Sequence, residues 1–245
     1  STSKYTFIDH SCWRYILRKL VSHLSQYAHD SYIDGVKKTG ITIDKIPSIK
    51  HVDQQISKFG WSAVPVSGFL PPAAFMEFQA LGILPIASDM RSVEHMEYTP
   101  APDIVHEAAG HAPILVNEDF SRYLKAYAEA AKFAILSKED LDVYEAIRVL
   151  SDLKENPLAK PEEISLAMEN LDRANKSVYI ISEGAYLARM YWWTAEYGMI
   201  GDMNNPKIYG AGLLSSVGES AACFDSKVKK IPLTSSCLDF NYDIT

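Results

Sequence analysis

Two histidines, His106 and His111, restrict how this chain can fold more than any other feature, because they stand five residues apart in an apolar segment. Asp103 precedes them and can cap a helix by accepting a hydrogen bond from an unpaired amide of its first turn. Five residues of a regular α-helix rotate by about 140°, so the two rings would point in different directions. We expect Gly110 to supply a turn that returns His111 to the side of His106, and Pro113 to end the helix.

The five-residue gap also bears on the type of metal site. In the HExxH motif of zinc proteases, the histidines are four residues apart on one helix face and the glutamate acts as the base. That geometry is lost here, and two histidines need a third ligand. Glu196 is the natural candidate, because it stands in an almost uncharged helical segment where a carboxylate is costly to bury unless it is paired or binds a metal. Two imidazoles and one carboxylate form the facial triad of iron(II) oxygenases, whereas on spacing alone a structural role for the three residues is the alternative.

The overall composition narrows the classes of partner. The chain of 245 residues has a net charge of −7 and no run of Lys or Arg that would form a basic stripe, which argues against nucleic-acid binding. Its three cysteines, Cys12, Cys223 and Cys237, form no CxxC pair, as is typical of free thiols in a reducing compartment. There is no N-terminal signal region, and prolines interrupt the uncharged stretch 59–76. We therefore expect a soluble, cytoplasmic protein without a membrane span.

The apolar pattern predicts a mainly α fold with a small β component, in a single domain that spans 1–245. Apolar residues recur at three- and four-residue steps from 9 to 38, as on one face of a helix. Two prolines divide the charged segment 137–176, which suggests a helical hairpin standing off the core. We further expect helices at 50–58, 73–81, 119–135 and 178–200, a loop leading into a helix at 209–223, strand and loop between 61 and 86, and an irregular or extended C-terminal end.

Three blocks of the sequence, in this order, resemble one known family. They are Thr99-Pro100-x-Pro102-Asp103-x-x-His106-Glu107-x-x-Gly110-His111-x-Pro113, Tyr191-Trp192-x-Thr194-x-Glu196-x-Gly198, and Tyr209-Gly-Ala-Gly-Leu-Leu-Ser215-Ser-x-Gly218-Glu219. The family that they resemble is the pterin-dependent aromatic amino acid hydroxylases. The N-terminal Tyr5-Thr-x-x-Asp-His10-x-x-Trp13-Arg and Gly60-Trp61 resemble the short bacterial phenylalanine hydroxylases. The resemblance covers most of 5–135 and 183–245 and implies the family's catalytic-domain architecture.

The resemblance also implies the reaction and its metal. The expected enzyme hydroxylates the ring of an aromatic amino acid, with L-Phe converted to L-Tyr, and uses O2 and a tetrahydropterin such as tetrahydrobiopterin. By position, His106, His111 and Glu196 match the Fe(II) ligands of the family. Glu107 matches a catalytic acid beside the pterin. The other residues implied on the pterin side are Gly68, Leu70 and Phe75.

The resemblance also implies which residues bind the amino acid substrate. Arg91 matches the arginine that pairs with the substrate carboxylate, a contact that suits the fork of a guanidinium group. Asp103 would steady that arginine as well as cap the helix. Trp192 stands four residues before Glu196, which would place both on one helix face and crowd an indole more than a phenyl ring. The remaining residues implied around the substrate or the metal-bound histidine are Thr99, Pro102, Gly212 and Ser215.

The sequence departs from the family pattern in two respects. His111 and Glu196 are 85 residues apart, roughly twice the family separation, and the extra residues coincide with 137–176. The family's catalytic domain usually continues beyond Thr245, so the chain is expected to be either a compact enzyme or a fragment. We expect a monomer or a small homo-oligomer.

Three alternative functions stay open. They are a zinc-dependent hydrolase that uses the same three ligands with Glu107 as base, a hydroxylase that prefers Trp, and a binding protein that retains the fold without turnover.

Overall fold

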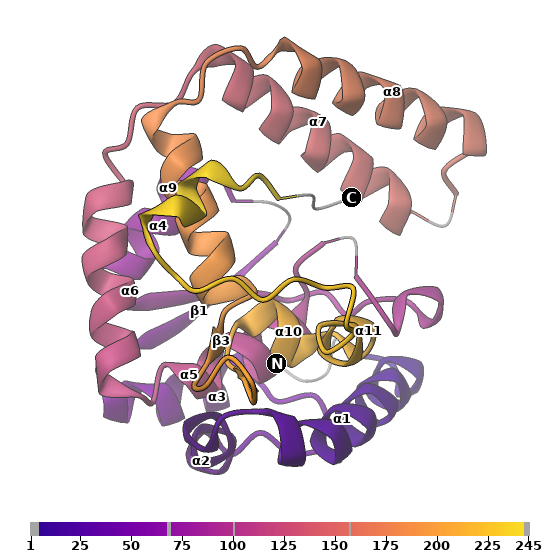
Figure 1. The fold of residues 1–245 in the computed structure, drawn as a ribbon. Coiled ribbons are helices and arrows are strands. Elements are labelled where there is room, and N and C mark those ends of the chain that lie inside the picture. The colour runs from indigo at the N-terminus through magenta and orange to yellow at the C-terminus, as the bar shows by residue number, and fades with distance from the viewer. Residues whose placement is uncertain (1–4, 68–69, 100, 157, 243–245) are drawn as a thin grey trace.

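The computed structural model describes residues 5–67, 70–99, 101–156 and 158–242, and within them helices surround a small β component, which confirms the predicted fold class (Figure 1). Among these residues, none of the helices is long and apolar enough to cross a membrane. The helices are α1 (Phe7–Tyr27), α2 (Asp30–Thr39), α3 (Ile49–Ile56), α4 (Pro72–Ala80), α5 (Ala112–Ile114), α6 (Glu118–Ala131), α7 (Lys138–Glu155), α8 (Pro161–Ser177), α9 (Glu183–Tyr191), α10 (Ala211–Ser215) and α11 (Val217–Ala222). The strands are β1 (Ser62–Val66), β2 (Ile83–Ala87), β3 (Met199–Ile200) and β4 (Lys207–Ile208), the π-helical segments are Val105–His111 and Trp192–Glu196, and the 3-10 turns are Ser57–Phe59, Val93–His95 and Ser235–Asp239.

The single helix expected at 9–38 was a wrong prediction, because the structure has two helices there, α1 and α2. The backbone is extended at Ala28 and His29, between the two. The His29 N–H donates to the carbonyl oxygen of Ile208 at 3.0 Å, and Ala28 forms a β-bridge with the same residue. Ile208 belongs to β4, so pairing with a strand far along the chain separates the helices, and local apolar periodicity does not reveal such a pairing.

The π-helical segment Val105–His111 and the short α5 that follows it are clamped between α2 and α10. A Cβ placed on Gly35 of α2 would lie 2.0 Å from the carbonyl oxygen of Pro113, and a Cβ on Gly110 would lie 2.8 Å from that of Ala211. These two glycines therefore permit a close approach on both sides that a larger residue would prevent. The Tyr32 hydroxyl also donates to the carbonyl oxygen of Ala109 at 2.8 Å, which ties α2 to the π-helical segment.

The strand and loop expected between 61 and 86 form a parallel β-α-β unit. β1 and β2 pair in register from Ser62 with Ile83 to Val66 with Ala87, and α4 connects them. A proline begins α4, where the missing N–H is harmless because the first helical turn has no partner for it. α4 packs against α6, and Gln79 of α4 donates a hydrogen bond to Tyr191 of α9. One face of α4 therefore lies next to α9.

The helix expected at 178–200 is shorter and changes character within its length. Ser182 caps α9 by accepting a hydrogen bond from the Ala185 N–H, so 178–182 is a loop. After Tyr191 the hydrogen bonding becomes π-helical, as in the bond of 2.8 Å from the Tyr197 N–H to the carbonyl oxygen of Trp192. The chain then enters β3, which pairs with β4 in antiparallel fashion.

The helical hairpin expected at 137–176 is confirmed as α7 and α8, which lie at the top of the molecule in the view of Figure 1. The two helices bury a small apolar cluster of their own, formed around Leu150, Ala167 and Leu171. The two ends of the hairpin meet at its base, where the Gly184 N–H donates to the carbonyl oxygen of Ile135 at 3.0 Å. The hairpin therefore enters and leaves the rest of the fold at nearly one point.

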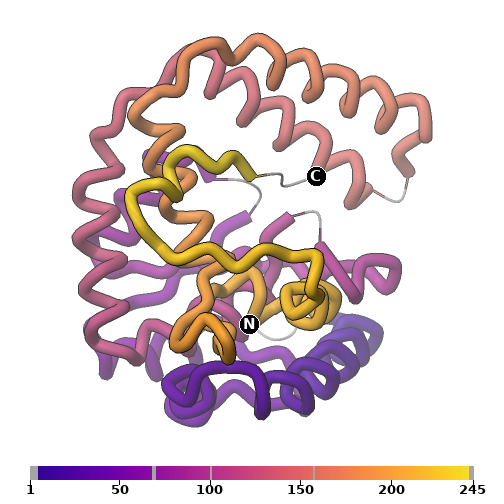
Figure 2. The backbone as a smooth tube through the Cα atoms, in the orientation of Figure 1, coloured from indigo at the N-terminus to yellow at the C-terminus, as the bar shows by residue number. Residues whose placement is uncertain are grey.

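The C-terminal segment runs as an irregular chain with one 3-10 turn, as expected, and lies along α9 (Figure 2). Arg189 donates to the carbonyl oxygen of Leu238 at 2.7 Å, and the Trp193 indole N–H donates to that of Phe240 at 3.0 Å. These bonds fix the segment against α9 and the π-helical Trp192–Glu196.

Candidate metal centre

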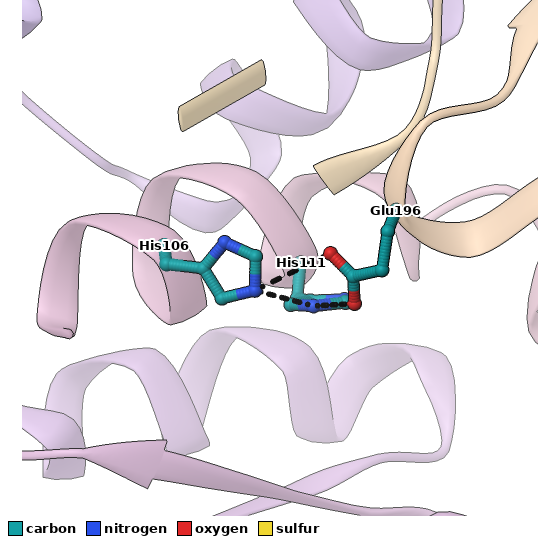
Figure 3. Close-up of side chains that lie close together, drawn as sticks. All are labelled: His106, His111 and Glu196. Atoms are coloured by element: carbon teal, nitrogen blue, oxygen red, sulfur yellow. Dashed lines mark hydrogen bonds and ion pairs between the residues drawn. The ribbon is translucent and has the colours of Figure 1, made fainter. Parts of the chain in front are cut away.

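The three predicted ligands converge at the centre of the fold (Figure 3). The Nε2 atoms of His106 and His111 are 3.1 Å apart. Glu196 places Oε1 3.0 Å from Nε2 of His111 and Oε2 3.4 Å from Nε2 of His106. Two residues of this set come from one π-helical segment and the third comes from the other, so the sequence separation between His111 and Glu196 is closed by the fold.

The π-helix explains how two histidines five residues apart can face each other. Its hydrogen bonds run from residue i to residue i+5, so residues five apart lie on the same side. The Ala112 N–H accordingly donates to the carbonyl oxygen of Glu107, and the rings of His106 and His111 lie 4.7 Å apart. The predicted turn at Gly110 was therefore wrong, because Gly110 lies within the helix, and the helix continues through Pro113 in α5.

The spacing of the donor atoms fits a divalent cation. Ligands bound at about 2.1 Å and at right angles to each other lie about 3.0 Å apart, close to the observed separations. Two imidazole nitrogens and a carboxylate all direct lone pairs into the same small volume, and a cation between them would remove their mutual repulsion. Donors of this type, on one face of an octahedron, match the facial triad that holds non-haem iron(II).

The surroundings of His106 and Glu196 favour the protonation states that metal binding needs. Burial lowers the pKa of His106 to about 4, which keeps this imidazole neutral at physiological pH. Burial alone would raise the pKa of the Glu196 carboxyl, but the neighbouring imidazoles of His111 and His106 lower it to about 2. For His111, burial lowers the pKa and the adjacent Glu196 carboxylate outweighs it, so the net shift is upward. Glu196 therefore carries a negative charge at the centre of the site.

α10 orients two of the three ligands. The Ser215 hydroxyl donates to the carbonyl oxygen of Ala211 at 2.7 Å and lies 3.0 Å from Nδ1 of His106. Since the hydroxyl proton is used, Nδ1 of His106 donates to it, and the Nε2 lone pair is left for a metal. The backbone of Gly212 lies close enough to the Glu196 carboxylate to help lower its pKa. Both Gly212 and Ser215 thus lie beside the metal ligands, whereas their implied part in substrate binding stays a prediction.

Arg91 and Asp103 form a buried pair at the start of the π-helical segment. The Asp103 carboxylate accepts two hydrogen bonds of 2.8 Å, from Nε and from one terminal nitrogen of the guanidinium. Its Oδ1 also accepts from the His106 N–H at 3.0 Å, which is the expected helix-capping contact. Burial alone would raise the pKa of Asp103, but Arg91 lowers it. Both side chains are buried, so this is not a surface ion pair.

Of the residues implied on the pterin side, Gly68 lies outside the described residues, and the other three differ in their surroundings. Glu107 is buried, burial raises the pKa of its carboxyl to about 8, and its Oε2 has no hydrogen-bond partner within the described chain. Leu70 is half-buried just before α4. Phe75, on α4, packs edge-on against the Tyr191 ring at 6.0 Å. The roles of these residues stay predictions.

The other residues implied on the substrate side, Trp192, Thr99 and Pro102, differ in their burial and contacts. The Trp192 indole is stacked between the rings of Tyr197, at 4.8 Å, and Tyr242, at 4.5 Å. Thr99 donates to the carbonyl oxygen of Ala101 at 2.7 Å, whereas Pro102 is exposed. None of these contacts by itself shows a bound substrate, so the three assignments also stay predictions.

The sequence did not point to Tyr191 or Gln79. Because α-helical spacing was assumed, Trp192, four residues before Glu196, was expected to face the metal. In a π-helix the residue five positions before Glu196 is the one in register, and that residue is Tyr191. Its hydroxyl accepts a hydrogen bond of 2.8 Å from Gln79, which is 112 positions away in the sequence. A tyrosine five residues before the carboxylate ligand is the signal that could have identified it.

Comparison with known proteins agrees with the site. Phenylalanine-4-hydroxylase of Chromobacterium violaceum is 28% identical over 224 residues, which cover 91% of this chain and 61% of that protein. The crystal structure of phenylalanine hydroxylase from the same organism, with bound iron(III) and 7,8-dihydrobiopterin, matches with a TM-score of 0.68 at 26% identity, over 91% of this chain and 66% of that one. The cobalt-bound form matches with a TM-score of 0.72 at 25% identity, over 100% of this chain and 73% of that one.

The chain spans 61% and 58% of the length of two curated relatives that it matches, the phenylalanine-4-hydroxylases of Chromobacterium violaceum and Ralstonia nicotianae. The model of the biopterin-dependent aromatic amino acid hydroxylases matches residues 1–140 and 177–243, and so omits most of the α7–α8 hairpin. The chain belongs to the biopterin-dependent aromatic amino acid hydroxylase family.

Proposed function

We propose that this protein hydroxylates the aromatic ring of L-Phe to give L-Tyr, with O2 and a tetrahydropterin as co-substrates and Fe(II) bound by His106, His111 and Glu196. The observation that carries the proposal is the convergence of these three ligands in facial-triad geometry, in a chain of this family. When bound, the iron would supply the activation of O2, for which the tetrahydropterin provides two electrons. One oxygen atom would enter the substrate ring, and the other would leave on the pterin.

The protein's own contribution is to orient the reactants and exclude water. Three protein ligands leave half of an octahedron open, so O2 and the co-substrates can meet on one side of the metal. Ser215 and Gly212 hold the ligands His106 and Glu196 in place, so little reorganisation is needed when a metal binds. On the pterin side, Phe75 can stack on the planar ring, and the unpartnered Oε2 of Glu107 can hydrogen-bond to it.

On the substrate side, the guanidinium of Arg91 is the proposed anchor for the amino acid carboxylate. Its hydrogen bonds to Asp103 and to the Ser215 carbonyl use three of its five N–H donors, so within the described chain donors remain for a second carboxylate. These hydrogen bonds to Asp103 fix the guanidinium group before a substrate binds, which reduces the conformational entropy that the arginine side chain loses on binding. Thr99, Pro102 and Trp192 are proposed to complete the walls of this site, and Gly68 and Leu70 those of the pterin site.

The test of this function is to load the protein with Fe(II), add tetrahydrobiopterin and each of Phe, Tyr and Trp under air, and identify the products. Formation of L-Tyr from L-Phe with matching O2 uptake is the expected result. A zinc-dependent hydrolase would instead retain zinc on metal analysis, would consume no O2, and would depend on Glu107 as a base. Absence of any pterin-dependent O2 uptake in the iron-loaded protein would contradict the proposal.

Phe should be preferred to Trp as a substrate. The resemblance implies Trp192 as a wall of the substrate pocket, and because its ring stacks on those of Tyr197 and Tyr242, this wall would be rigid and would suit a phenyl ring better than an indole. Differences of shape in an apolar pocket are typically worth about 1–3 kcal/mol, which corresponds to a ratio of kcat/KM of roughly 10 to 200. Competition between equal amounts of Phe and Trp, with product analysis, measures this ratio, and Trp192→Phe should move it toward Trp. A higher kcat/KM for Trp in the unaltered protein would reverse the assignment.

The α7–α8 hairpin should be dispensable for metal binding. It has its own small core, and its ends meet at Ile135 and Gly184, so a short Gly-Ser linker can replace 137–176 without stretching the chain. We expect the shortened protein to bind Fe(II) with an affinity within about threefold of the parent, as measured by competition with a chelator. Loss of soluble, iron-loaded protein would contradict this.

The KM for Phe is a less suitable measure of the same deletion. Desolvation and the charges of Asp103 and Asp89 raise the pKa of the exposed Glu155 to about 7, so the end of α7 is electrostatically coupled to the Arg91–Asp103 pair. Removing the hairpin therefore changes the charge around the proposed substrate anchor even where the metal site is intact.

The organisation of the chain is proposed on similar grounds. One continuous core supports the metal centre, so we treat 1–245 as a single catalytic domain with the hairpin as an insertion. The three free cysteines support a reducing compartment such as the cytoplasm. The net charge of −7 supports the absence of a nucleic-acid partner, and a monomer or small homo-oligomer is the proposed state.

A further inference from the structure

Helix α4 holds Tyr191 at two points. Gln79 is 1% exposed, and its side-chain nitrogen donates to the Tyr191 hydroxyl at 2.8 Å. Phe75 stands one turn earlier on the same face of α4 and packs edge-on against the Tyr191 ring, with an angle of 88° between the ring planes. The ring and the hydroxyl of Tyr191 are therefore both fixed by the same short helix.

Gln79 is a costly residue at this position. Its Oε1 is buried without a hydrogen-bond partner among the residues that the structure describes. A methionine of similar length would fill the same space without burying an unpaired amide oxygen, which destabilises a folded protein. Residues that violate a local rule of stability in this way are expected mainly at functional sites.

Tyr191 stands at the junction between α9 and the π-helical segment that ends in Glu196. It precedes Glu196 by five residues, which is the repeat of the π-helix, so the two side chains lie on the same side. Burial, together with the charges of Glu196 and Glu107, raises the pKa of the Tyr191 hydroxyl, as expected for a phenol on the metal-binding side of the helix. A displacement of Tyr191 would therefore be transmitted to the carboxylate ligand through one turn of helix.

We propose that Gln79 is a positioning residue that fixes Tyr191, and through it the π-helical turn that carries Glu196. α4 begins just after Leu70 and carries Phe75, so the same helix forms one wall of the pterin site and supports the metal ligand. This second part rests on the proposed function, whereas the link between Gln79 and Glu196 rests on the contacts alone.

A double-mutant cycle with cobalt(II) as the probe tests the link. Gln79→Met removes the donor and keeps the volume, and Tyr191→Phe removes the hydroxyl and keeps the ring. We expect each change to weaken cobalt binding by about threefold to tenfold, the usual worth of one neutral hydrogen bond, and to alter the visible absorption of the bound cobalt. The double variant should bind cobalt no more weakly than either single variant, because both remove the same bond.

Two results would overturn the proposal: effects of the two changes that simply add, or unchanged cobalt binding and spectrum in Tyr191→Phe. The second result decides the matter even if Gln79→Met does not fold. Tyr127→Phe is the matched control, because the Tyr127 hydroxyl donates to the carbonyl oxygen of Leu187 at 2.6 Å and does not join α9 to α4. It should lower the melting temperature and leave the cobalt spectrum unchanged.

Kinetics separate this proposal from the proposed function. In an active hydroxylase, Gln79→Met should lower kcat by about threefold to tenfold and leave the KM for the amino acid within twofold. If the parent protein does not hydroxylate Phe at all, the proposed function fails, and the cobalt cycle still decides the role of Gln79.

Discussion

Replacing Glu196 with alanine should remove iron from the protein and lower the hydroxylation of Phe by more than about a hundredfold. Changes to residues that merely support metal ligands typically cost 10–100-fold in affinity or activity, so loss of a direct ligand should exceed that range. The carboxylate is also the single negative charge among the three ligands, because its pKa is lowered to about 2 and an imidazole ligand is neutral. Iron content after gel filtration and the rate of tyrosine formation measure the two effects.

Glu107→Gln is the matched control for this substitution. Glu107 lies on the same π-helical segment as the histidines and is buried like Glu196, but it is not one of the three converging ligands. The variant should therefore retain its iron, whatever happens to turnover. His106→Ala should behave like Glu196→Ala, and full iron and activity in either alanine variant would show that the triad is wrongly assigned.

Replacing Arg91 with alanine should raise the KM for Phe by about 30-fold to several thousandfold and leave the iron site assembled. A charged hydrogen bond in a desolvated site is typically worth about 2–5 kcal/mol, which sets this range. The same change leaves the Asp103 carboxylate buried without its partner, and breaking a buried pair in this way typically costs about 3–5 kcal/mol of stability. Substrate kinetics and thermal unfolding of the same preparation separate the two consequences.

Arg91→Lys makes the result specific to the shape of the guanidinium. A lysine keeps the positive charge near Asp103 but cannot form the bidentate contact, so its KM should fall between those of the parent and the alanine variant. Arg14, a half-buried arginine that donates to the backbone carbonyl oxygen of Asp44 and to the Ser11 hydroxyl, serves as a control position, and Arg14→Ala should leave the KM unchanged. An unaltered KM for Phe in Arg91→Ala would rule out its role in substrate binding.

The metal ligands could be predicted because each stands out chemically from its surroundings and because all three lie in blocks that resemble one family. A carboxylate in an apolar helix and two histidines beside a helix-capping aspartate are unusual enough to be noticed without a structure. The backbone that unites the ligands could not be predicted in the same way. Apolar periodicity distinguishes a helix from a strand, but it does not show where an α-helix widens to a π-helix. For this reason the turn at Gly110 was expected where none exists.

Contacts between residues that are far apart in the sequence could not be predicted either. The break between α1 and α2 depends on Ile208, and the bond from Gln79 to Tyr191 joins positions far apart in the sequence. Neither can be seen in any local window. The α7–α8 hairpin was predicted well because it is local: its helices contact mainly each other, and its charged surface and prolines mark its limits.

The π-helical backbone has a consequence for how the coordination sphere is encoded. All three ligands lie on helices that are wider than usual, so their meeting depends on the number of residues between them as much as on their chemical identity. Shortening the stretch between His106 and His111 by one residue would restore a regular helix and produce the four-residue spacing of a different class of metal site. A graft of these residues onto an ordinary helical scaffold would need that altered spacing, whereas the native spacing requires a scaffold with the same widened turns. In this protein, the number of residues between the ligands is itself part of the metal-binding motif.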